Sequence, residues 1–458
     1  MQGRWGRPPT VETLFVMAFA LIGLRLGLRP IGDNSTFVHL RTGIDAVAGR
    51  GIPRTDPYSF TAAGEPWVVQ SWLVSYVYGT LHRLAGFEAV VAFHGLVYGG
   101  LAAVMATLAR TRSARRTCLA AGAAIGVGVA TWSPRPLAVA LLAFALTVLV
   151  VERRWAPWWL LPIGWVWVNS HGSWVLGGAW LVLLLVAGRR EARRYLPWWL
   201  GGVVLGALNP LGPKLLLFPL TLVSKTPNFA RVVEWRAPTF RGPFGVVTLL
   251  ALASLVVVLA RSERRPPLSD IVPAAVFVAM ALVSQRNLAP AAVVLAPVLG
   301  RALATEHGPE DRSPLNTAIA VVFGVAALLF VAVTMAGDPL DLDGYPVEAA
   351  ARHVPRGVRT ATTDIGGCYL VLERGRSANV FVDDRFDVYP ERVVKDYLAL
   401  HDGHPSGTAV LDRYRVDTVL WPADKALVAI LDREPGDWRR TYEDDDWVVF
   451  VRQDDGED

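Results

Sequence analysis

Long apolar segments, separated by short polar turns, recur along most of this 458-residue chain. The segments 137–151, 246–260 and 318–337 contain no charged residue, which is typical of transmembrane helices. Hydrophobic residues make up 53% of the chain and charged residues 19%, whereas about a quarter of an average soluble protein is charged. The segment 11–24 lies where a signal peptide would, but it lacks a small-residue cleavage site and is interpreted as the first span. The chain is therefore predicted to be a polytopic α-helical membrane protein.

The turns between the apolar segments alternate between two kinds. Arginine-rich turns occur at 110–116, 153–154, 189–194 and 261–265, and the positive-inside rule places them in the cytoplasm. This orientation predicts about eleven spans in a plasma (inner) membrane, with the N-terminus inside and the C-terminal domain outside. The expected spans lie near 11–30, 88–109, 118–131, 137–151, 156–168, 174–188, 196–208, 243–260, 268–284, 288–304 and 315–337.

A change in charge divides the chain into two domains. Residues 338–458 contain 26 acidic and 15 basic residues, whereas residues 1–337 contain 14 and 30. The basic excess lies in short loops between spans, which serves membrane topology rather than nucleic-acid binding. From residue 345 onward helices alternate with strands, predicting a soluble, Rossmann-like α/β domain. The expected strands are 358–364, 379–384 and 416–422, with a hairpin formed by 439–445 and 447–452.

Two external loops interrupt the membrane domain, at 31–87 and 209–242. Within the first loop, 36–48 has an amphipathic helical pattern, and the apolar stretch 67–84 is broken by polar residues. Both segments are interpreted as helices that lie on the membrane surface. The outward loops together carry Asp, His, Arg, Asn, Glu and Trp residues, which predicts a site at the boundary between water and lipid.

Three residues of the first loop are candidates for chemistry. Asp33 could accept a proton from an acceptor hydroxyl, but it could equally cap the helix that follows it. Asp56 precedes a proline, so a turn role is favoured over a place in a sugar or acceptor pocket. His39 could face the site or lie at the membrane interface. Gln70 and Trp72 are further candidates for the sugar or acceptor pocket.

Arg135 and Arg286 each lie at the external mouth of a helical hairpin. A guanidinium near hydrocarbon is costly, so two of them on one side favour a shared anion, and phosphate matches the guanidinium fork. Snorkelling to lipid headgroups is the alternative. Lys214 and Arg236 could join the same phosphate site.

Further polar residues of the outward loops could line the sugar or acceptor pocket. These are Asn169 and His171, followed by a glycine, and the adjacent Glu234 and Trp235. Tryptophan stacks on sugar rings but also anchors membrane interfaces, which is the default for most of the 17 Trp residues of this chain.

An aspartate in the first external loop, surface helices in that loop, many spans and an external C-terminal domain together resemble the GT-C superfamily of membrane glycosyltransferases. These enzymes use polyprenyl-phosphate-linked sugars as donors. More narrowly, the chain resembles a family of bacterial GT-C-like membrane proteins over nearly its whole length. The segments that carry this resemblance are 33–43, 52–73, Arg135-Pro136, 169–172, 209–212, Glu234-Trp235 and 366–422.

The resemblance implies that Asp33 is the catalytic carboxylate. Relatives tend to have Asp-x-Asp at this place, whereas this chain has Ser35 at the second position. A single carboxylate beside Asn34 and Ser35 is a poor site for a hard cation. We therefore expect no tightly bound metal or other cofactor, with Asp56 as the only candidate to replace the missing ligand.

The residues and the resemblance together predict an extracytoplasmic glycosyltransferase. It would transfer a sugar from a polyprenyl-phosphate donor to an envelope glycan, lipid or protein, with inversion and with Asp33 as the general base. One alternative is a non-catalytic scaffold of an envelope polysaccharide system, which the loss of the second aspartate would fit. A lipid-linked-sugar flippase is another, and it would place polar residues at mid-bilayer and show an inverted repeat.

Overall fold

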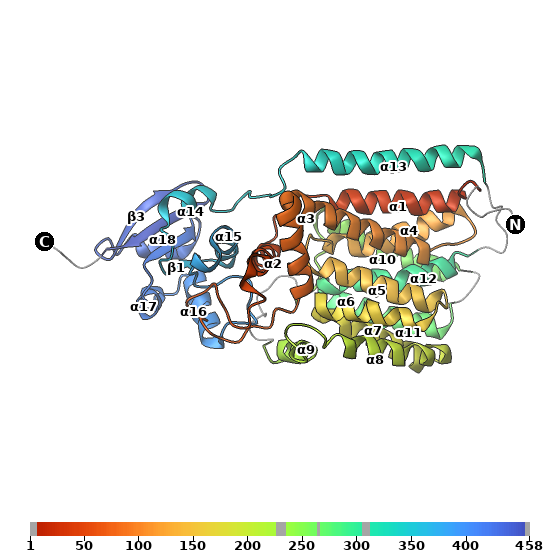
Figure 1. The fold of residues 1–458 in the computed structure, drawn as a ribbon, viewed down its shortest axis with the longest axis horizontal. Coiled ribbons are helices and arrows are strands. Elements are labelled where there is room, and N and C mark those ends of the chain that lie inside the picture. The colour runs from red at the N-terminus through yellow and green to blue at the C-terminus, as the bar shows by residue number, and fades with distance from the viewer. Residues whose placement is uncertain (1–6, 226–234, 263–265, 305–311, 454–458) are drawn as a thin grey trace. The chain divides into compact units, whose positions relative to one another are not determined.

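The computed structural model describes residues 7–225, 235–262, 266–304 and 312–453 (Figure 1). The chain divides into two compact units. The helical unit comprises Met1–Pro30, Ala85–Pro219 and Arg231–Pro339, and the α/β unit comprises Ile31–Leu84, Leu220–Ala230 and Leu340–Asp458. The sequence had suggested one boundary near residue 338. The structure differs in that residues 31–84, expected to belong to the membrane domain, pack with the C-terminal residues.

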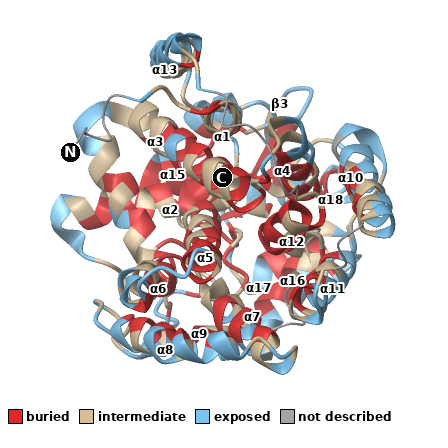
Figure 2. Cartoon of the chain, turned by 90° about the vertical axis from the view of Figure 1, so that its right-hand side faces the viewer, coloured by how far each residue is buried: buried red, intermediate tan, exposed pale blue. Residues whose placement is uncertain are grey.

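The helical unit is built from helices that lie side by side (Figure 1). They are α1 (Val11–Gly27), the second part of α3 (Trp72–Leu108), α4 (Ala114–Gly128), α5 (Leu137–Glu152), α6 (Leu160–Ser170), α7 (Val175–Val186), α8 (Leu196–Leu205), α10 (Gly242–Arg261), α11 (Leu268–Val283), α12 (Leu288–Ala302) and α13 (Pro314–Met335). Helix α12 is buried along nearly its whole length and packs on α4, α5 and α11. Figure 2 shows the contrast with α13, which is exposed and packs mainly on α1.

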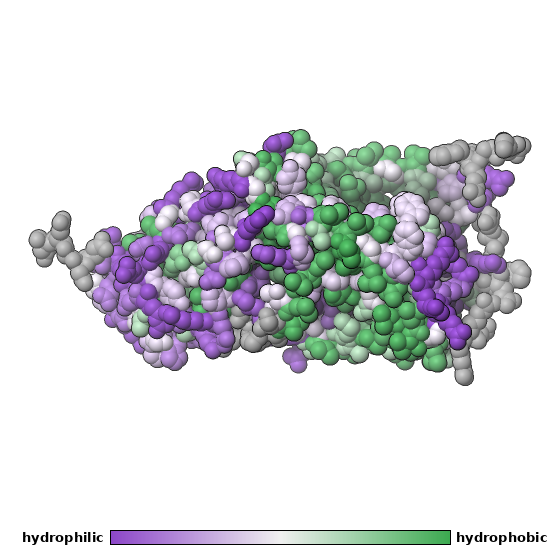
Figure 3. Space-filling model, turned by 60° about the horizontal axis from the view of Figure 1, so that its bottom comes forward, coloured by the Kyte–Doolittle hydropathy of each residue, from purple (hydrophilic) through white to green (hydrophobic). Residues whose placement is uncertain are grey.

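The helical unit turns apolar side chains outward (Figure 3). Val186, Val204, Val256 and Leu328, on four different helices, are each more than 60% exposed. A continuous apolar surface of this kind is unfavourable in water and favourable in lipid. Among the described helices, α3 and α13 are long and apolar enough to cross a bilayer by themselves. The helical unit therefore has the outer surface expected of a membrane-embedded domain.

The arginine-rich turns of the helical unit gather at one end of its helices. The ion pairs there join Glu152 to Arg189 and Arg301, Asp270 to Arg301, Glu12 to Arg110, and Arg154 to Glu191. These contacts connect the start of α1 with the end of α3, the end of α5 with the turn after α7 and with the end of α12, and the start of α11 with the end of α12. Because successive helices alternate in direction, the turns 129–136, 170–174, 206–213 and 284–287 lie at the opposite end.

Helix α3 consists of two helices, because its backbone breaks at Ala85 and Gly86. Gly86 has a φ of 73°, which only glycine adopts readily. The first part, 72–84, belongs to the α/β unit and corresponds to the surface helix expected at 67–84. The second part belongs to the helical unit and corresponds to the span expected near 88–109.

The α/β unit contains a four-stranded sheet in the order β1-β2-β4-β3. Strand β1 (Thr360–Thr362) is parallel to β2 (Thr418–Pro422), whereas β3 (Trp438–Glu443) and β4 (Trp447–Arg452) form an antiparallel hairpin. A parallel, Rossmann-like arrangement is thus limited to one strand pair. The helices of this unit are α2 (Asn34–Asp45), α14 (Val347–His353), α15 (Asp364–Arg374), α16 (Glu391–His401), α17 (Gly407–Arg413) and α18 (Ala426–Leu431).

The expected strand at 379–384 is wrong. Val380 forms isolated bridges with Thr360 and Ser59, but the ladder does not continue. The reason is local: the N–H of Asp383 donates to the Tyr389 hydroxyl, and the N–H of Arg385 donates to the Asp383 carboxylate. Backbone groups that a strand would use are bound to side chains instead.

Helix α2 is held tightly in the α/β unit. It crosses the first part of α3 where Gly43 meets Gly79, and a Cβ at Gly79 would lie 2.1 Å from the carbonyl oxygen of Gly43. Only glycine at both positions allows the two backbones to approach this closely. On its other side α2 packs against α15. The start of α2, which carries Asp33, is therefore fixed by packing along the helix.

Candidate functional site

Asp33 is the N-cap of α2. Its carboxylate accepts a hydrogen bond from the N–H of Thr36 at 3.3 Å, and its φ of −120° and ψ of 120° are those of a capping residue. The capping role that the sequence allowed is thus present. Asp33 is half-buried.

The other first-loop candidates lie in the same unit. His39 projects from α2, and its Nδ1 is 3.0 Å from the Ser75 hydroxyl on α3. Gln70 lies in the turn before α3 and Trp72 is the first residue of that helix, and both side chains are half-buried.

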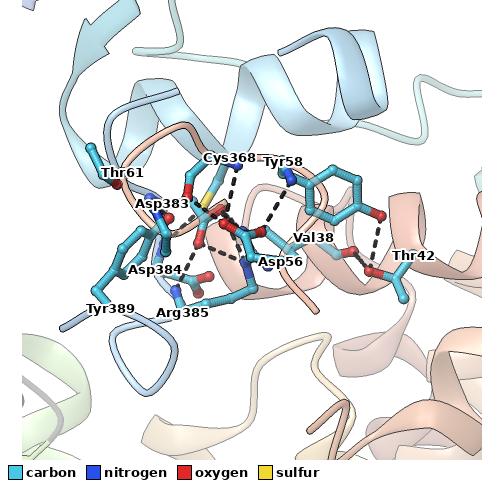
Figure 4. A network of polar contacts seen from close by, with 12 residues as sticks. Val38, Thr42, Asp56, Tyr58, Thr61, Cys368, Asp383, Asp384, Arg385 and Tyr389 are labelled. Atoms are coloured by element: carbon cyan, nitrogen blue, oxygen red, sulfur yellow. Dashed lines mark hydrogen bonds and ion pairs between the residues drawn. The ribbon is translucent and has the colours of Figure 1, made fainter. Parts of the chain in front are cut away.

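Asp56 lies in a buried polar network rather than at an open surface (Figure 4). Its carboxylate accepts hydrogen bonds from the backbone N–H groups of Tyr58 and Ser59, and one of its oxygens is 2.8 Å from the Arg385 guanidinium. This is the turn role that the Asp-Pro pair favoured, with an ion pair added. Both carboxylate oxygens of Asp56 are thus engaged within the network.

Arg385 is the centre of this network. Its guanidinium pairs with Asp383 at 2.6 Å as well as with Asp56, and both carboxylates are fully buried. Its Cζ lies 4.4 Å from the Trp67 ring centroid and 5.1 Å from that of Tyr58. Burial disfavours its charge, but the carboxylates of Asp383 and Asp56 raise the pKa of Arg385 well above its ordinary value. Arg385 is a structural cation that the sequence analysis had not singled out.

Asp387 lies beside this network and is half-buried. Burial raises its pKa to about 6, against opposing effects of Arg385 and Lys225. A carboxyl whose pKa is raised in the folded protein stabilises the fold below its unfolded pKa of about 3.9, and this contribution is lost as the pH rises through the folded value.

We therefore expect Asp387→Asn to stabilise the α/β unit at pH 7 by about 1–2 kcal/mol and to have no effect at pH 4. The measurement is thermal unfolding of the detergent-solubilised protein between pH 4 and pH 8. Asp445→Asn, at an exposed position of the same unit, serves as the control. Parallel pH profiles of wild type and Asp387→Asn would contradict the expectation.

In the helical unit, three candidate residues come together at the end opposite the arginine-rich turns. The Arg286 guanidinium lies 4.4 Å from the Trp235 ring centroid, a cation–π contact. The N–H of Gln285 donates to the carbonyl oxygen of Arg236 at 2.9 Å, which joins the two loops. Arg236 is exposed and Arg286 half-buried. This arrangement offers one ordered cation, one exposed cation and a flat aromatic surface.

Arg135 lies in the turn between α4 and α5 at this end of the helical unit. Two residues that the sequence analysis missed hold this turn. The Arg29 guanidinium donates to the Trp132 carbonyl oxygen at 2.5 Å, and the Tyr98 hydroxyl donates to that of Ser133 at 2.5 Å. The Tyr98 ring also stacks on that of Trp132, with centroids 5.0 Å apart. Nothing local marks Arg29 or Tyr98, because both act across the helix bundle.

The remaining candidates have distinct environments. Asn169 is fully buried in α6, where its amide donates to the Trp165 carbonyl oxygen. His171 ends α6 and its Nδ1 accepts the N–H of Ser173. Lys214 is exposed at the start of α9 (Lys214–Ser224). Glu234 lies outside the described residues. Among the described residues, no three His, Cys, Asp or Glu side chains are grouped as a metal site would require.

The candidate residues thus fall into two sets. Asp33, His39, Asp56, Gln70 and Trp72 belong to the α/β unit. The helical unit contains the other described candidates, which are Arg135, Asn169, His171, Lys214, Trp235, Arg236 and Arg286.

Comparison with solved structures identifies the fold. The crystal structure of ArnT from Cupriavidus metallidurans, bound to undecaprenyl phosphate, matches 96% of this chain and 97% of its own, with a TM-score of 0.50 and 15% identity. The apo oligosaccharyltransferase from Archaeoglobus fulgidus matches 89% of this chain and 69% of its own, with a TM-score of 0.50 and 12% identity. No protein-family model and no curated protein sequence matches the chain. The fold is GT-C-like, as the sequence resemblance predicted.

Proposed function

From this GT-C-like fold, we propose that the chain transfers a sugar from a polyprenyl-phosphate carrier to a cell-envelope acceptor at the outer face of the plasma membrane. The observation that carries the proposal is the concentration of Arg286, Arg236 and Trp235 at one end of the apolar helical unit. Cations beside a flat apolar ring, at the end of a lipid-facing bundle, suit a lipid-linked phosphate. A structurally similar protein, ArnT, binds undecaprenyl phosphate.

Exposed tryptophans mark the arginine-rich end of the helical unit as a membrane interface, and the arginine bias gives its orientation. Trp155, Trp158, Trp159 and Trp198 are each more than 40% exposed, and they lie near the arginine-rich end of the helical unit. Exposed tryptophans adjoining lysine or arginine turns are typical of a membrane interface. We place this end in the cytoplasm, so that the turns carrying Arg135 and Arg286 lie outside.

In the proposed reaction an acceptor hydroxyl attacks the anomeric carbon of the sugar. The new glycosidic bond forms as the bond to the phosphate oxygen breaks, and the bonding electrons leave with the polyprenyl phosphate. Arg286 and Arg135, with Arg236 and Lys214 as weaker contributors, stabilise the negative charge that develops on this leaving group. Asp33 takes the proton of the acceptor hydroxyl, and direct displacement inverts the anomeric centre.

The test of this function is a transfer assay with the purified full-length protein in lipid nanodiscs. A panel of undecaprenyl-phosphate-linked hexoses and pentoses is offered with a membrane extract as acceptor, and mass spectrometry follows released undecaprenyl phosphate and glycosylated product. Release coupled to product formation is expected. Transport of the intact lipid-linked sugar without cleavage would identify a flippase instead. If the protein neither cleaves nor transports the lipid-linked sugar, but deletion of its gene produces a phenotype, the protein is a scaffold.

Binding of the carrier phosphate gives a more direct prediction. Arg286→Gln is expected to weaken binding of undecaprenyl phosphate about 10-fold or more, because a charge-assisted hydrogen bond contributes about 1.5–3 kcal/mol. The control is Arg116→Gln at the arginine-rich end, where the side chain is exposed. Equal affinities of the two variants, measured by titration in nanodiscs, would remove Arg286 from the phosphate site.

A further inference from the structure

The segment after α13 holds the backbone that carries Asp33. Within the α/β unit, Leu340 forms a parallel bridge with Ile31, and the N–H of Asp341 donates to the Ile31 carbonyl oxygen at 3.0 Å. Gly32 packs so closely on Asp341 that a Cβ at position 32 would lie 2.9 Å from the carbonyl oxygen of Asp341. The chain entering Asp33 is therefore fixed from the C-terminal side of the sequence.

Tyr345 contacts both neighbours of Asp33. Its hydroxyl is 2.5 Å from Oδ1 of Asn34 and 3.3 Å from the carbonyl oxygen of Gly32. Asn34 is the first residue of α2 and Gly32 immediately precedes Asp33. A single side chain thus reaches the residues on either side of the carboxylate-bearing position, although it lies more than 300 residues away in the sequence.

The environment of Tyr345 keeps this hydroxyl in place and protonated. Its ring centroid lies 5.1 Å from that of Phe37 on α2 and 6.1 Å from that of Tyr369 on α15. Burial raises the pKa of Tyr345, and the neighbouring Cys368 and Asp33 raise it further. The hydroxyl is consequently a hydrogen-bond donor throughout the physiological pH range.

We propose that Tyr345 is a positioning residue for Asp33 in the transfer reaction, an inference that rests on the proposed function. The hydrogen bond from the Thr36 N–H holds the Asp33 side chain relative to α2. The position of the carboxylate therefore also depends on how firmly the backbone around Asp33 is held. A general base must lie within hydrogen-bonding reach of the proton it removes, and an error of about 1 Å can cost about 100-fold in rate. By binding Gly32 and Asn34, Tyr345 limits such movement without touching the substrate.

Tyr345→Phe tests this directly, because it keeps the ring and its contacts with Phe37 and Tyr369 and removes only the hydroxyl. In the transfer assay kcat is expected to fall about 10-fold, with the KM for the undecaprenyl-phosphate-linked sugar within a factor of two, since the loosened group acts in the chemical step rather than in donor binding. Tyr369→Phe is the matched control: the same change in the same aromatic cluster, at a hydroxyl with no hydrogen bond to a described residue. Its kcat is expected to stay at the wild-type value.

The outcomes separate this inference from the proposed function. Loss of activity in Asp33→Asn together with a wild-type kcat in Tyr345→Phe overturns the inference alone. Equal losses in Tyr345→Phe and Tyr369→Phe, in parallel with lowered melting temperatures, indicate a purely structural role and also overturn it. Full activity of Asp33→Asn removes Asp33 as the general base and with it this inference, whereas absence of transfer by the wild-type protein overturns the proposed function itself. If Tyr345→Phe does not fold, Asn34→Ala removes the hydrogen-bond acceptor instead, and the same kcat loss without a KM change is expected.

Discussion

Asparagine in place of Asp33 is expected to lower sugar transfer by about 10²–10⁴-fold while leaving the protein folded, which is the range that a general base contributes. The structure makes this substitution unusually clean. Asparagine and aspartate are equally good N-cap residues, so the amide oxygen at position 33 can still accept the N–H of Thr36. The substitution removes the negative charge of the carboxylate and with it the capacity to take a proton.

Two comparisons isolate that loss. Asp33→Ala removes the helix cap as well as the carboxylate and is expected to destabilise α2 by about 1 kcal/mol. Asp33→Asn keeps the cap, so no such loss of stability is expected. Asp343→Asn changes an exposed carboxylate of the same unit and should leave transfer within a factor of two. Rates and melting temperatures of the three variants are measured on the same nanodisc preparations. A folded Asp33→Asn variant with normal transfer would leave Asp33 a helix cap and nothing more.

The architecture of the helical unit could be foreseen because two signals act locally. Apolar composition indicates which segments are helices in lipid, and the arginine bias indicates which turns share an end. The ion pair of Glu152 with Arg189 joins two turns that the arginine bias had already grouped. The separation of the segment 67–84 from the span near 88–109 was predicted from the polar residues that interrupt the first segment, and the structure places the break at Ala85 and Gly86.

The grouping of residues 31–84 with the C-terminal part was not foreseen. An amphipathic pattern shows that one face of a helix is buried, but not what covers it. Phe37 and Leu40 are both fully buried, and in the structure α2 packs on α15 and on the first part of α3. The same pattern would serve for a helix on a lipid surface, which is how it had been interpreted.

The partners of the site residues were equally hidden. Asp56 and Arg385 are separated by more than 300 positions, as are Asn34 and Tyr345, and no spacing rule connects them. The role of Asp56 as a turn residue was accessible from the following proline, whereas its buried ion pair was not. Candidate residues could thus be named from chemistry, but their division between the two units required the three-dimensional arrangement.

Arg385→Met is expected to destabilise the α/β unit by about 3–5 kcal/mol, because it removes the cation from between two buried carboxylates. Asp56 and Asp383 have fully buried side chains, and each would lose its ion pair with Arg385. For a unit of this size the loss corresponds to a melting temperature about 10 °C lower. Methionine retains most of the length of the side chain, so the contacts with Tyr58 and Trp67 are altered mainly in charge.

The cost should come from uncompensated charge, and this can be tested within the same network. Adding Asp56→Asn and Asp383→Asn to Arg385→Met removes both stranded carboxylates, and part of the stability is expected to return. Arg376→Met, at an exposed arginine of the same unit, should change stability by less than about 0.5 kcal/mol. Unfolding is followed by tryptophan fluorescence in detergent, and opening of the 54–67 loop by its rate of tryptic cleavage at Arg54. If Arg385→Met and Arg376→Met have the same melting temperature, the ion pairs of Arg385 do not hold the 54–67 loop on the C-terminal residues of the α/β unit. The fixed position of α2 must then come from helix packing alone.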